Sequence, residues 1–128
     1  MTGYLDDIEK LTEENEFFRQ VLFTGKYCQL VVMCLKPNEE IGMEVHDTVD
    51  QFFRIEEGEG KVIMNGEEKE FKEGDAIIVP AGTQHNIINT SAEEELKLYT
   101  IYSPPNHPDR TVHQTKEEAM KAEEEHHH

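Results

Sequence analysis

Hydrophobic and polar residues alternate in short runs along most of the chain, a pattern typical of β-strands rather than helices. The apolar runs predict strands at 17–23, 28–36, 41–46, 50–58, 61–71, 75–82, 85–91 and 95–103. Within the fifth run, Asn65-Gly66 stands between apolar stretches and predicts a tight two-residue hairpin. Turn signals recur roughly every ten residues, a spacing that predicts an all-β sandwich or small barrel.

The two ends of the chain have different patterns. Residues 4–15 place Leu5, Ile8 and Leu11 at helical intervals among acidic residues and predict one short N-terminal helix. We therefore expect one domain, in which 1–27 form the helix and first strand and 28–103 form the barrel. The tail, 104–125, begins with prolines and ends in a charged, helix-like stretch that we expect to be mobile. Residues 126–128 are three histidines that resemble a purification tag, and we exclude them from the site search.

Charge and composition narrow the function. The formal net charge of -16 disfavours nucleic acid and anionic membranes as partners, because both would repel the chain. No apolar run approaches the ~18 residues of a membrane span, and the acidic N-terminus does not resemble a signal peptide, so we expect a cytoplasmic protein. Cys28 and Cys34 share one predicted strand, too far apart for a disulfide, and we expect both to be reduced.

Four polar side chains interrupt the apolar pattern in a way that favours a metal site. Glu44 and His46 are two residues apart and therefore share one face of a strand. After the polar turn at 47–50, Gln51 begins a strand on whose face Phe53 also lies, and His85 follows a Pro-Ala-Gly turn. If these faces line the barrel interior, a carboxylate, two imidazoles and an amide oxygen meet, and all are metal ligands.

The turn before His85 carries a recognisable motif. The pattern G-x5-P-x-G-x2-H-x3-N is matched in full by Gly74, Pro80, Gly82, His85 and Asn89. The chain thereby resembles the cupin superfamily, whose members are small jelly-roll barrels, commonly dimeric, that hold a divalent metal. The resemblance covers about residues 28–103 and implies a double-stranded β-helix (jelly-roll) cupin barrel behind the N-terminal helix.

The family's first motif is matched in spacing but changed in content. When its last glycine is placed on Gly58, Gln51 takes the usual glutamate position, and Glu44 and His46 take two histidine positions. The resemblance then implies metal ligands Glu44, His46, Gln51 and His85, which leave a divalent ion at net +1. Mn²⁺, Fe²⁺, Ni²⁺ and Zn²⁺ all suit two nitrogens and two oxygens. A metal-free polar pocket is the alternative, and Asp50 is a rival to Gln51 that lies one residue out of register.

The small single-domain form is similar to cupins described as mannose-6-phosphate isomerase-like. This implies an enzyme acting on a small polar or sugar-like substrate through an open metal site. The alternatives are a metal-dependent dioxygenase or decarboxylase, and a non-catalytic module that binds a small metabolite. An enzyme also needs a proton-transfer group near the metal. Candidates are Tyr99 and Tyr102, whose parity allows only one to point inward, and His107 and His113 in the tail.

Two further expectations concern partners. A phosphate site favours clustered cations, whereas this chain offers only scattered ones: Arg19, Lys26, Arg54, Lys97 and Arg110. Apolar residues on both faces of the run from Cys28 to Leu35 indicate that an outer sheet face is also covered, for which a second copy in a homodimer is the simplest explanation.

Overall fold

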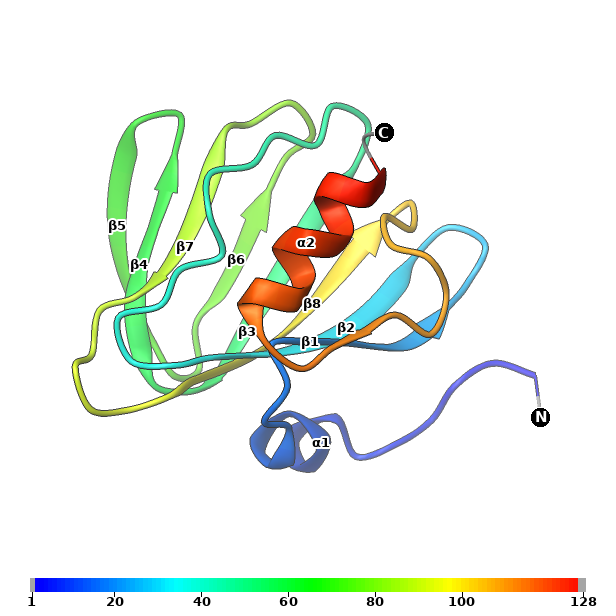
Figure 1. Ribbon diagram of the computed structural model, residues 1–128, viewed down its shortest axis with the longest axis horizontal. Coiled ribbons are helices and arrows are strands. Elements are labelled where there is room, and N and C mark those ends of the chain that lie inside the picture. Colours follow the sequence, from blue (N-terminus) through cyan, green and yellow to red (C-terminus); the bar gives the residue numbers. More distant parts are fainter. Residues whose placement is uncertain (1, 127–128) are drawn as a thin grey trace.

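A computed structural model describes residues 2–126 of the chain (Figure 1). Two helices and nine strands make up the fold. In chain order these are α1 (Ile8–Glu14), β1 (Arg19–Thr24), β2 (Gln29–Leu35), β3 (Asp50–Glu57), β4 (Glu59–Met64), β5 (Glu67–Lys72), β6 (Ala76–Val79), β7 (His85–Asn89), β8 (Leu96–Ser103), β9 (Val112–His113) and α2 (Lys116–His126). No helix among the described residues is long and apolar enough to cross a membrane.

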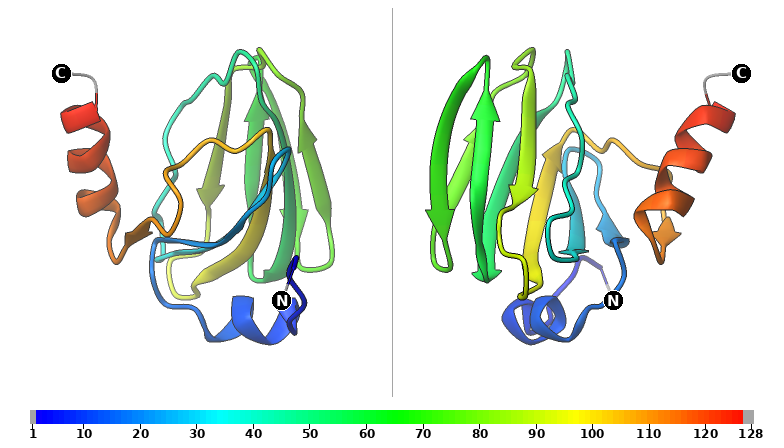
Figure 2. Two further views of the ribbon diagram at one scale, coloured as in Figure 1. Left: turned by 90° about the vertical axis from the view of Figure 1, so that its right-hand side faces the viewer. Right: turned by 60° about the vertical axis from the view of Figure 1, so that its left-hand side comes forward.

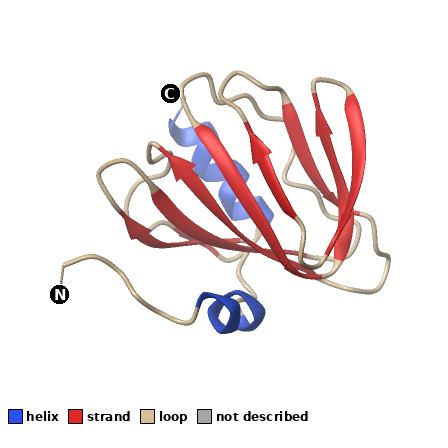
Figure 3. Ribbon diagram, turned by 180° about the vertical axis from the view of Figure 1, so that it is seen from behind, coloured by secondary structure: helices blue, strands red, loops and turns tan. Residues whose placement is uncertain are grey.

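The strands form two sheets that pack face to face (Figures 1 and 3). The larger has the order β6-β3-β8-β2-β1-β9, and the smaller has the order β5-β4-β7. All neighbours are antiparallel, and the crossovers between distant strands are those of a double-stranded β-helix. The expected all-β jelly-roll fold with a short N-terminal helix is thereby confirmed.

The hydrophobic core lies between the two sheets. Val31, Phe53 and Leu98 contribute from the larger sheet, and Val62 and Ile87 contribute from the smaller one. Burying one such side chain stabilises the folded chain by about 1.5–3 kcal/mol relative to leaving it exposed. The inward positions repeat every second residue, as the alternating sequence predicted.

Local signals predicted most strand boundaries well, with one exception. Asn65 and Gly66 have φ of 48° and 85° and form the predicted hairpin turn between β4 and β5. The segment 41–46, in contrast, is not a regular strand. It is extended but pairs only through isolated bridges, Glu40 with Ile88 and Glu44 with His85. The prediction was wrong because an extended segment becomes a strand only when a neighbour offers a continuous ladder.

The helices cover opposite parts of the larger sheet. α1 contacts β2, β3 and β8, and Lys97 donates from Nζ to the carbonyls of Glu13 and Asn15 at 2.8 and 3.0 Å, which satisfies the end of that helix. The outer-face residue Cys34 is buried here, and its backbone N–H donates to the Phe17 carbonyl. At this position the chain's own N-terminal segment supplies the cover for which we expected a second copy.

The C-terminal segment is more ordered than the expectation of a mobile tail. β9 pairs with β1, and α2 lies in front of the larger sheet, as Figure 1 and the turned view at the left of Figure 2 show. Ala119 of α2 is 2% exposed and belongs to the core. The charged sequence hid this packing because, among the helix side chains that the structure describes, only the small Ala119 joins the core. Of the three suspected tag residues, His127 and His128 lie outside the described residues.

Candidate functional site

A turn between β6 and β7 places His85. Gly82 has φ of +82°, a conformation that glycine adopts at no steric cost, and Thr83 N–H donates to the Pro80 carbonyl. The His85 Nδ1 lies 3.0 Å from the Thr83 carbonyl oxygen, so Nδ1 carries the proton and donates it. The Nε2 of this 3%-exposed imidazole is left with its lone pair.

Glu44 and His46 are held beside His85 by backbone contacts. Glu44 and His85 exchange two backbone hydrogen bonds, of 2.8 and 2.9 Å, and the His46 carbonyl accepts from Gly82 N–H. The two side chains point together, as predicted, with His46 Nε2 at 3.4 Å from Glu44 Oε2. The His46 and His85 rings have centroids 5.5 Å apart.

Asp50 and Gln51, the two candidates for the remaining ligand, are the first residues of β3, and their side chains lie in different surroundings. Gln51 points inward and is 3% exposed; its Nε2 donates to Thr100 Oγ1 at 3.0 Å. Asp50 is exposed, and its Oδ1 accepts from Ala81 N–H at 2.8 Å. Asp50 therefore anchors the 80–82 turn from outside, and Gln51 is the one of the two whose side chain points into the barrel interior.

Several polar atoms of this cluster lack the partners that burial normally requires. Within residues 2–126, Gln51 Oε1 and His46 Nε2 are buried side-chain atoms without a hydrogen-bond partner. Burial raises the pKa of Glu44 to about 7 and lowers the pKa of His46. No three His, Cys, Asp or Glu side chains of the described part form a preassembled metal cluster. The donor chemistry nevertheless fits a divalent cation, which would accept electron pairs from these orphaned atoms.

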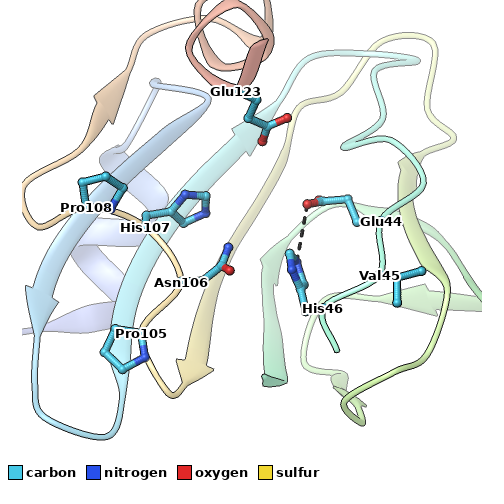
Figure 4. A pocket seen from close by; sticks show the side chains of 8 residues that line it. All are labelled: Glu44, Val45, His46, Pro105, Asn106, His107, Pro108 and Glu123. Atoms are coloured by element: carbon cyan, nitrogen blue, oxygen red, sulfur yellow. Dashed lines mark ion pairs between the residues drawn. The ribbon is translucent and has the colours of Figure 1, made fainter. Parts of the chain in front are cut away.

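A pocket of about 750 Å³ opens beside Glu44 and His46. Its lining comes from three segments: Glu44, Val45 and His46; Pro105, Asn106, His107 and Pro108; and Glu123 of α2. Glu44 and His46 from one loop, His107 from another and Glu123 from α2 point into this space (Figure 4). The pocket can therefore admit a small molecule next to the proposed ligands.

His107 of the pocket lining contacts a buried tyrosine, Tyr102. His107 Nε2 lies 3.2 Å from the Tyr102 hydroxyl, and the Tyr102 ring meets the His46 ring edge-on at 5.9 Å between centroids. Burial is the main cause that raises the pKa of Tyr102 to about 12 and lowers the pKa of His107 to about 3. Both groups are thus neutral at pH 7.

The other two expected acid–base candidates are placed differently. Tyr99 faces outward, opposite Val32 and Arg54, and its ring lies 6.2 Å from that of Phe52. The structure does not bring it to the pocket, because its parity in β8 is opposite to that of Tyr102. His113 lies on β9 opposite Arg19, with a buried Nδ1 that has no partner among the described residues.

Arg19 and Glu123 are two residues of this region whose role sequence reasoning missed. Arg19 is 2% exposed at the start of β1, and its Nη1 lies 3.7 Å from Glu123 Oε1. A signal for Arg19 existed, since it shares parity with the core residue Val21. The approach of Glu123 follows from the docking of α2, for which the sequence holds no local signal.

The final motif residue, Asn89, has a structural role. Its Nδ2 donates to the carbonyls of Leu35, Lys36 and Glu94 at 2.9–3.2 Å, and its Oδ1 accepts from Ser91 N–H. This network fixes the loop after β7 against the end of β2. The motif therefore combines one candidate ligand with the residues that hold the surrounding turns.

Comparison with known proteins agrees with this geometry. The family model described as "Cupin domain" matches residues 31–102, which include all four candidate ligands. The chain belongs to the cupin family. It is 46% identical over 127 residues to the uncharacterized protein YrkC of Bacillus subtilis, covering 94% of this chain and 68% of that one.

Two solved structures are similar to this chain. BH2720 from Bacillus halodurans has 44% identity and a TM-score of 0.90, covering 92% of this chain and 93% of its own. A Thermotoga maritima protein described as a predicted oxalate decarboxylase has 26% identity and a TM-score of 0.58, covering 62% of this chain and 69% of its own. The cupin fold is thus shown for this chain, together with its compatibility with a small-molecule ligand.

Proposed function

We propose that this cupin binds one divalent metal ion, Mn²⁺, Fe²⁺, Ni²⁺ or Zn²⁺, through Glu44, His46, Gln51 and His85. The observation that carries the proposal is a pair of buried atoms without hydrogen-bond partners among the described residues, Gln51 Oε1 and His46 Nε2. His46 Nε2 lies 3.4 Å from Glu44 Oε2, beside the His85 imidazole whose Nδ1 is already engaged. A hydrogen bond from the ring nitrogen that does not bind the metal commonly orients metal-binding histidines in proteins. One carboxylate and three neutral donors would leave a divalent ion at net +1.

The activity we propose is that of an enzyme acting on a small polar or sugar-like substrate, of the isomerase type. A bound divalent ion would supply Lewis acidity that polarises a substrate carbonyl or hydroxyl oxygen. The pocket lies directly beside Glu44 and His46, so a substrate there reaches the proposed centre.

The residues for proton transfer would be His107 and Tyr102. His107 lines the pocket, and its Nε2 lies 3.2 Å from the Tyr102 hydroxyl. Isomerisation moves a proton between neighbouring atoms of the substrate and needs a positioned group that accepts and returns it. A neutral imidazole in contact with a phenol would supply such a group, and His113 of β9 would lower its basicity.

A decarboxylase is the second candidate, because the Thermotoga maritima neighbour is described as a predicted oxalate decarboxylase. A metal-dependent dioxygenase and a non-catalytic metabolite-binding module complete the alternatives. Assays for isomerisation of sugar phosphates, release of CO₂ from small carboxylates and uptake of oxygen distinguish the three reactions. A binding module would show none of them while still retaining a metabolite.

The metal proposal is tested by elemental analysis of protein that lacks residues 126–128, since three terminal histidines can themselves collect metal. We expect one metal ion per chain in the wild type, close to none in His85→Ala, and one in His113→Ala, a matched histidine change outside the proposed donor set. Equal metal content in the wild type and His85→Ala would contradict the proposal.

We further propose a cytoplasmic homodimer. Supporting observations are two free cysteines and an apolar row across the outer face of the larger sheet. The row is in register across five strands: Phe23, Leu30, Ile101, Phe52 and Ile78. Ile78 is 64% exposed on β6, at the edge of the sheet. Sedimentation should give a dimer for the wild type and a monomer for Ile78→Glu; a wild-type monomer at micromolar concentration would contradict this arrangement.

A further inference from the structure

Arg19 points into the interior of the barrel rather than to solvent. In the ladder it lies opposite Met33, which is opposite Leu98 and then Ile55, and all three of these partners belong to the core. Residues directly opposite one another in an antiparallel sheet share a face. A guanidinium that is 2% exposed on this face is costly to bury unless an anion accompanies it.

The guanidinium lacks such a partner in adequate geometry. Within residues 2–126, its Nε and Nη1 are buried without a hydrogen-bond acceptor. The carboxylate facing it is Glu123, at 3.7 Å from Nη1, which is an ion pair but not a hydrogen bond. The Glu123 side chain is 50% exposed and comes from the last helix of the chain. Arg19 is thus paired loosely with a carboxylate that solvent can also reach.

The Arg19 guanidinium lies next to the pocket, because its ion-pair partner Glu123 belongs to the pocket lining. After burial, its charge is the next cause that lowers the pKa of His107, another lining residue. Arg19 is therefore a cation behind this pocket wall, and Glu123 is the lining residue that contacts it.

The chain's other scattered cations are engaged elsewhere. The Lys97 ammonium binds two carbonyls at the end of α1, and Arg54 pairs with Glu56 at 3.1 Å on the outer face. Lys26 lies over the exposed Tyr27 ring, and Arg110 is 93% exposed. Arg19 is thus the one of these five with two buried free donors, and a single guanidinium of this kind can hold one oxyanion without a cluster of cations.

We propose that Arg19 is the anion-binding residue of the pocket and that a carboxylate or phosphate group of a small substrate takes the place now held by Glu123. The inference rests on the proposed function, because it names the substrate class of that same pocket. An oxyanion that enters between Arg19 and the proposed metal ligands can accept from both Nε and Nη1, which Glu123 does not do. Glu123 is then a competing internal carboxylate that neutralises Arg19 until a substrate arrives.

The test is calorimetric titration of the full chain with lactate, with its neutral analogue lactamide, and with inorganic phosphate, each with and without one equivalent of Zn²⁺. We expect millimolar binding of lactate or phosphate and at least tenfold weaker binding of lactamide. Arg19→Gln should weaken anion binding about tenfold or more in both conditions. Binding of phosphate alone would assign a phosphate ester, and binding of lactate alone would assign a carboxylate.

Glu123→Gln provides a second variant on an exposed position, where misfolding is not a concern. It removes the competing charge, and we expect anion binding to become about two- to fivefold tighter. The inference is overturned if neither anion binds the wild type, if Arg19→Gln binds them as tightly as the wild type, or if Glu123→Gln weakens binding. Zinc stoichiometry separates this outcome from the proposed function: Arg19→Gln should retain zinc. Arg19-dependent anion binding to a chain that binds no zinc would refute the metal proposal alone.

Discussion

The Nδ1 of His85 lies 3.0 Å from the carbonyl oxygen of Thr83, two residues earlier in the chain. This local contact selects one of the two neutral tautomers of the imidazole and leaves the lone pair of the other nitrogen free, beside a His46 ring whose centroid is 5.5 Å away. The turn at 80–83 therefore has a chemical role as well as a geometric one, because it supplies the carbonyl that orients a candidate metal ligand.

The tautomer of His85 is the first prediction. In protein lacking residues 126–128, nitrogen-15 NMR should show a proton on Nδ1 and an unprotonated Nε2 at pH 8. Addition of Zn²⁺ should shift the Nε2 resonance more than the Nδ1 resonance, because Nε2 holds the free lone pair. A proton on Nε2 in the metal-free protein would contradict the orientation of the ring.

The second prediction concerns Gln51→Glu, which adds a carboxylate next to Glu44. Metal affinity at neutral pH should rise on the order of tenfold, because the cation relieves repulsion between two carboxylates. Competition titration against a chelator measures this change. Asp50→Asn is the matched control, and its affinity should equal that of the wild type because Asp50 bonds to Ala81 outside the cluster. Weaker binding by Asp50→Asn, with no effect of Gln51→Glu, would reverse the assignment.

A pair of tyrosine variants tests the proton-transfer proposal. Tyr102→Phe removes the hydroxyl that contacts His107 and should lower kcat by about 10²-fold or more, the lower end of the range for general acid–base groups. Tyr99→Phe, on the outward face of the same strand, should change kcat less than twofold. Metal content should be unchanged in both. Equal rates for the two variants would show that Tyr102 only packs.

Stability should fall on acidification in a way that depends on His107. Its pKa is about 3 in the folded chain and about 6.5 when unfolded, so between these values the unfolded chain binds more protons. The free energy of unfolding should therefore decrease as pH falls from about 6.5 toward 3, by up to ~1.4 kcal/mol per pH unit from this group. Urea unfolding with chelator present, at several pH values, measures the slope.

The matched variant for this measurement is His107→Gln, whose amide keeps a polar contact with Tyr102 but does not titrate. Its slope should be shallower than that of the wild type over the same pH range. Glu44 contributes with the opposite sign between about 4.5 and 7, since its folded pKa is raised, and this contribution is common to both proteins. Identical slopes for the two proteins would show that the pKa of His107 in the folded chain is not lowered as predicted.

The two cysteines should differ strongly in reactivity. Burial, with the nearby Glu95 carboxylate, raises the pKa of the Cys34 thiol to about 12, whereas Cys28 is exposed. Iodoacetamide at pH 8 should modify Cys28 and leave Cys34 intact until the chain unfolds, as mass spectrometry can show. Cys28→Ser should take up no label when folded and one label in guanidinium; rapid labelling of the folded variant would mean that β2 opens readily.

The sequence correctly predicted the structural features that depend on residues close to one another along the chain. The hairpin at Asn65-Gly66 and the inward faces of β3 and β8 followed from turn chemistry and alternation. The motif spacing gave Gln51 and His85 as two of the four candidate ligands, and that assignment stays a prediction. The segment 41–46 was assigned to a strand because its residues favour one, yet only its neighbours determine whether a ladder forms.

The cationic side of the site could not be predicted in the same way. Arg19 is distant in sequence from the candidate ligands and comes near them only through sheet order, in which β1 lies beyond β2. Glu123 depends on the docking of α2, whose apolar contribution is essentially Ala119. The parity of Arg19 with Val21 indicates that its side chain points inward. The pairing of Arg19 with Glu123 leaves no periodic trace in the sequence, because it depends on one side chain from each element.

The stretch from Lys36 to Val49 supplies two of the four proposed ligands while lying outside every regular strand, held through isolated bridges at Glu40 and Glu44. A bound ion would connect Glu44 and His46 of this loop to Gln51 of β3 and His85 of β7. It would thereby add cross-links where the backbone forms only isolated bridges. Metal occupancy can then be measured on this one loop before any substrate is known. Bound metal should slow its amide hydrogen exchange and its cleavage by a glutamate-specific protease.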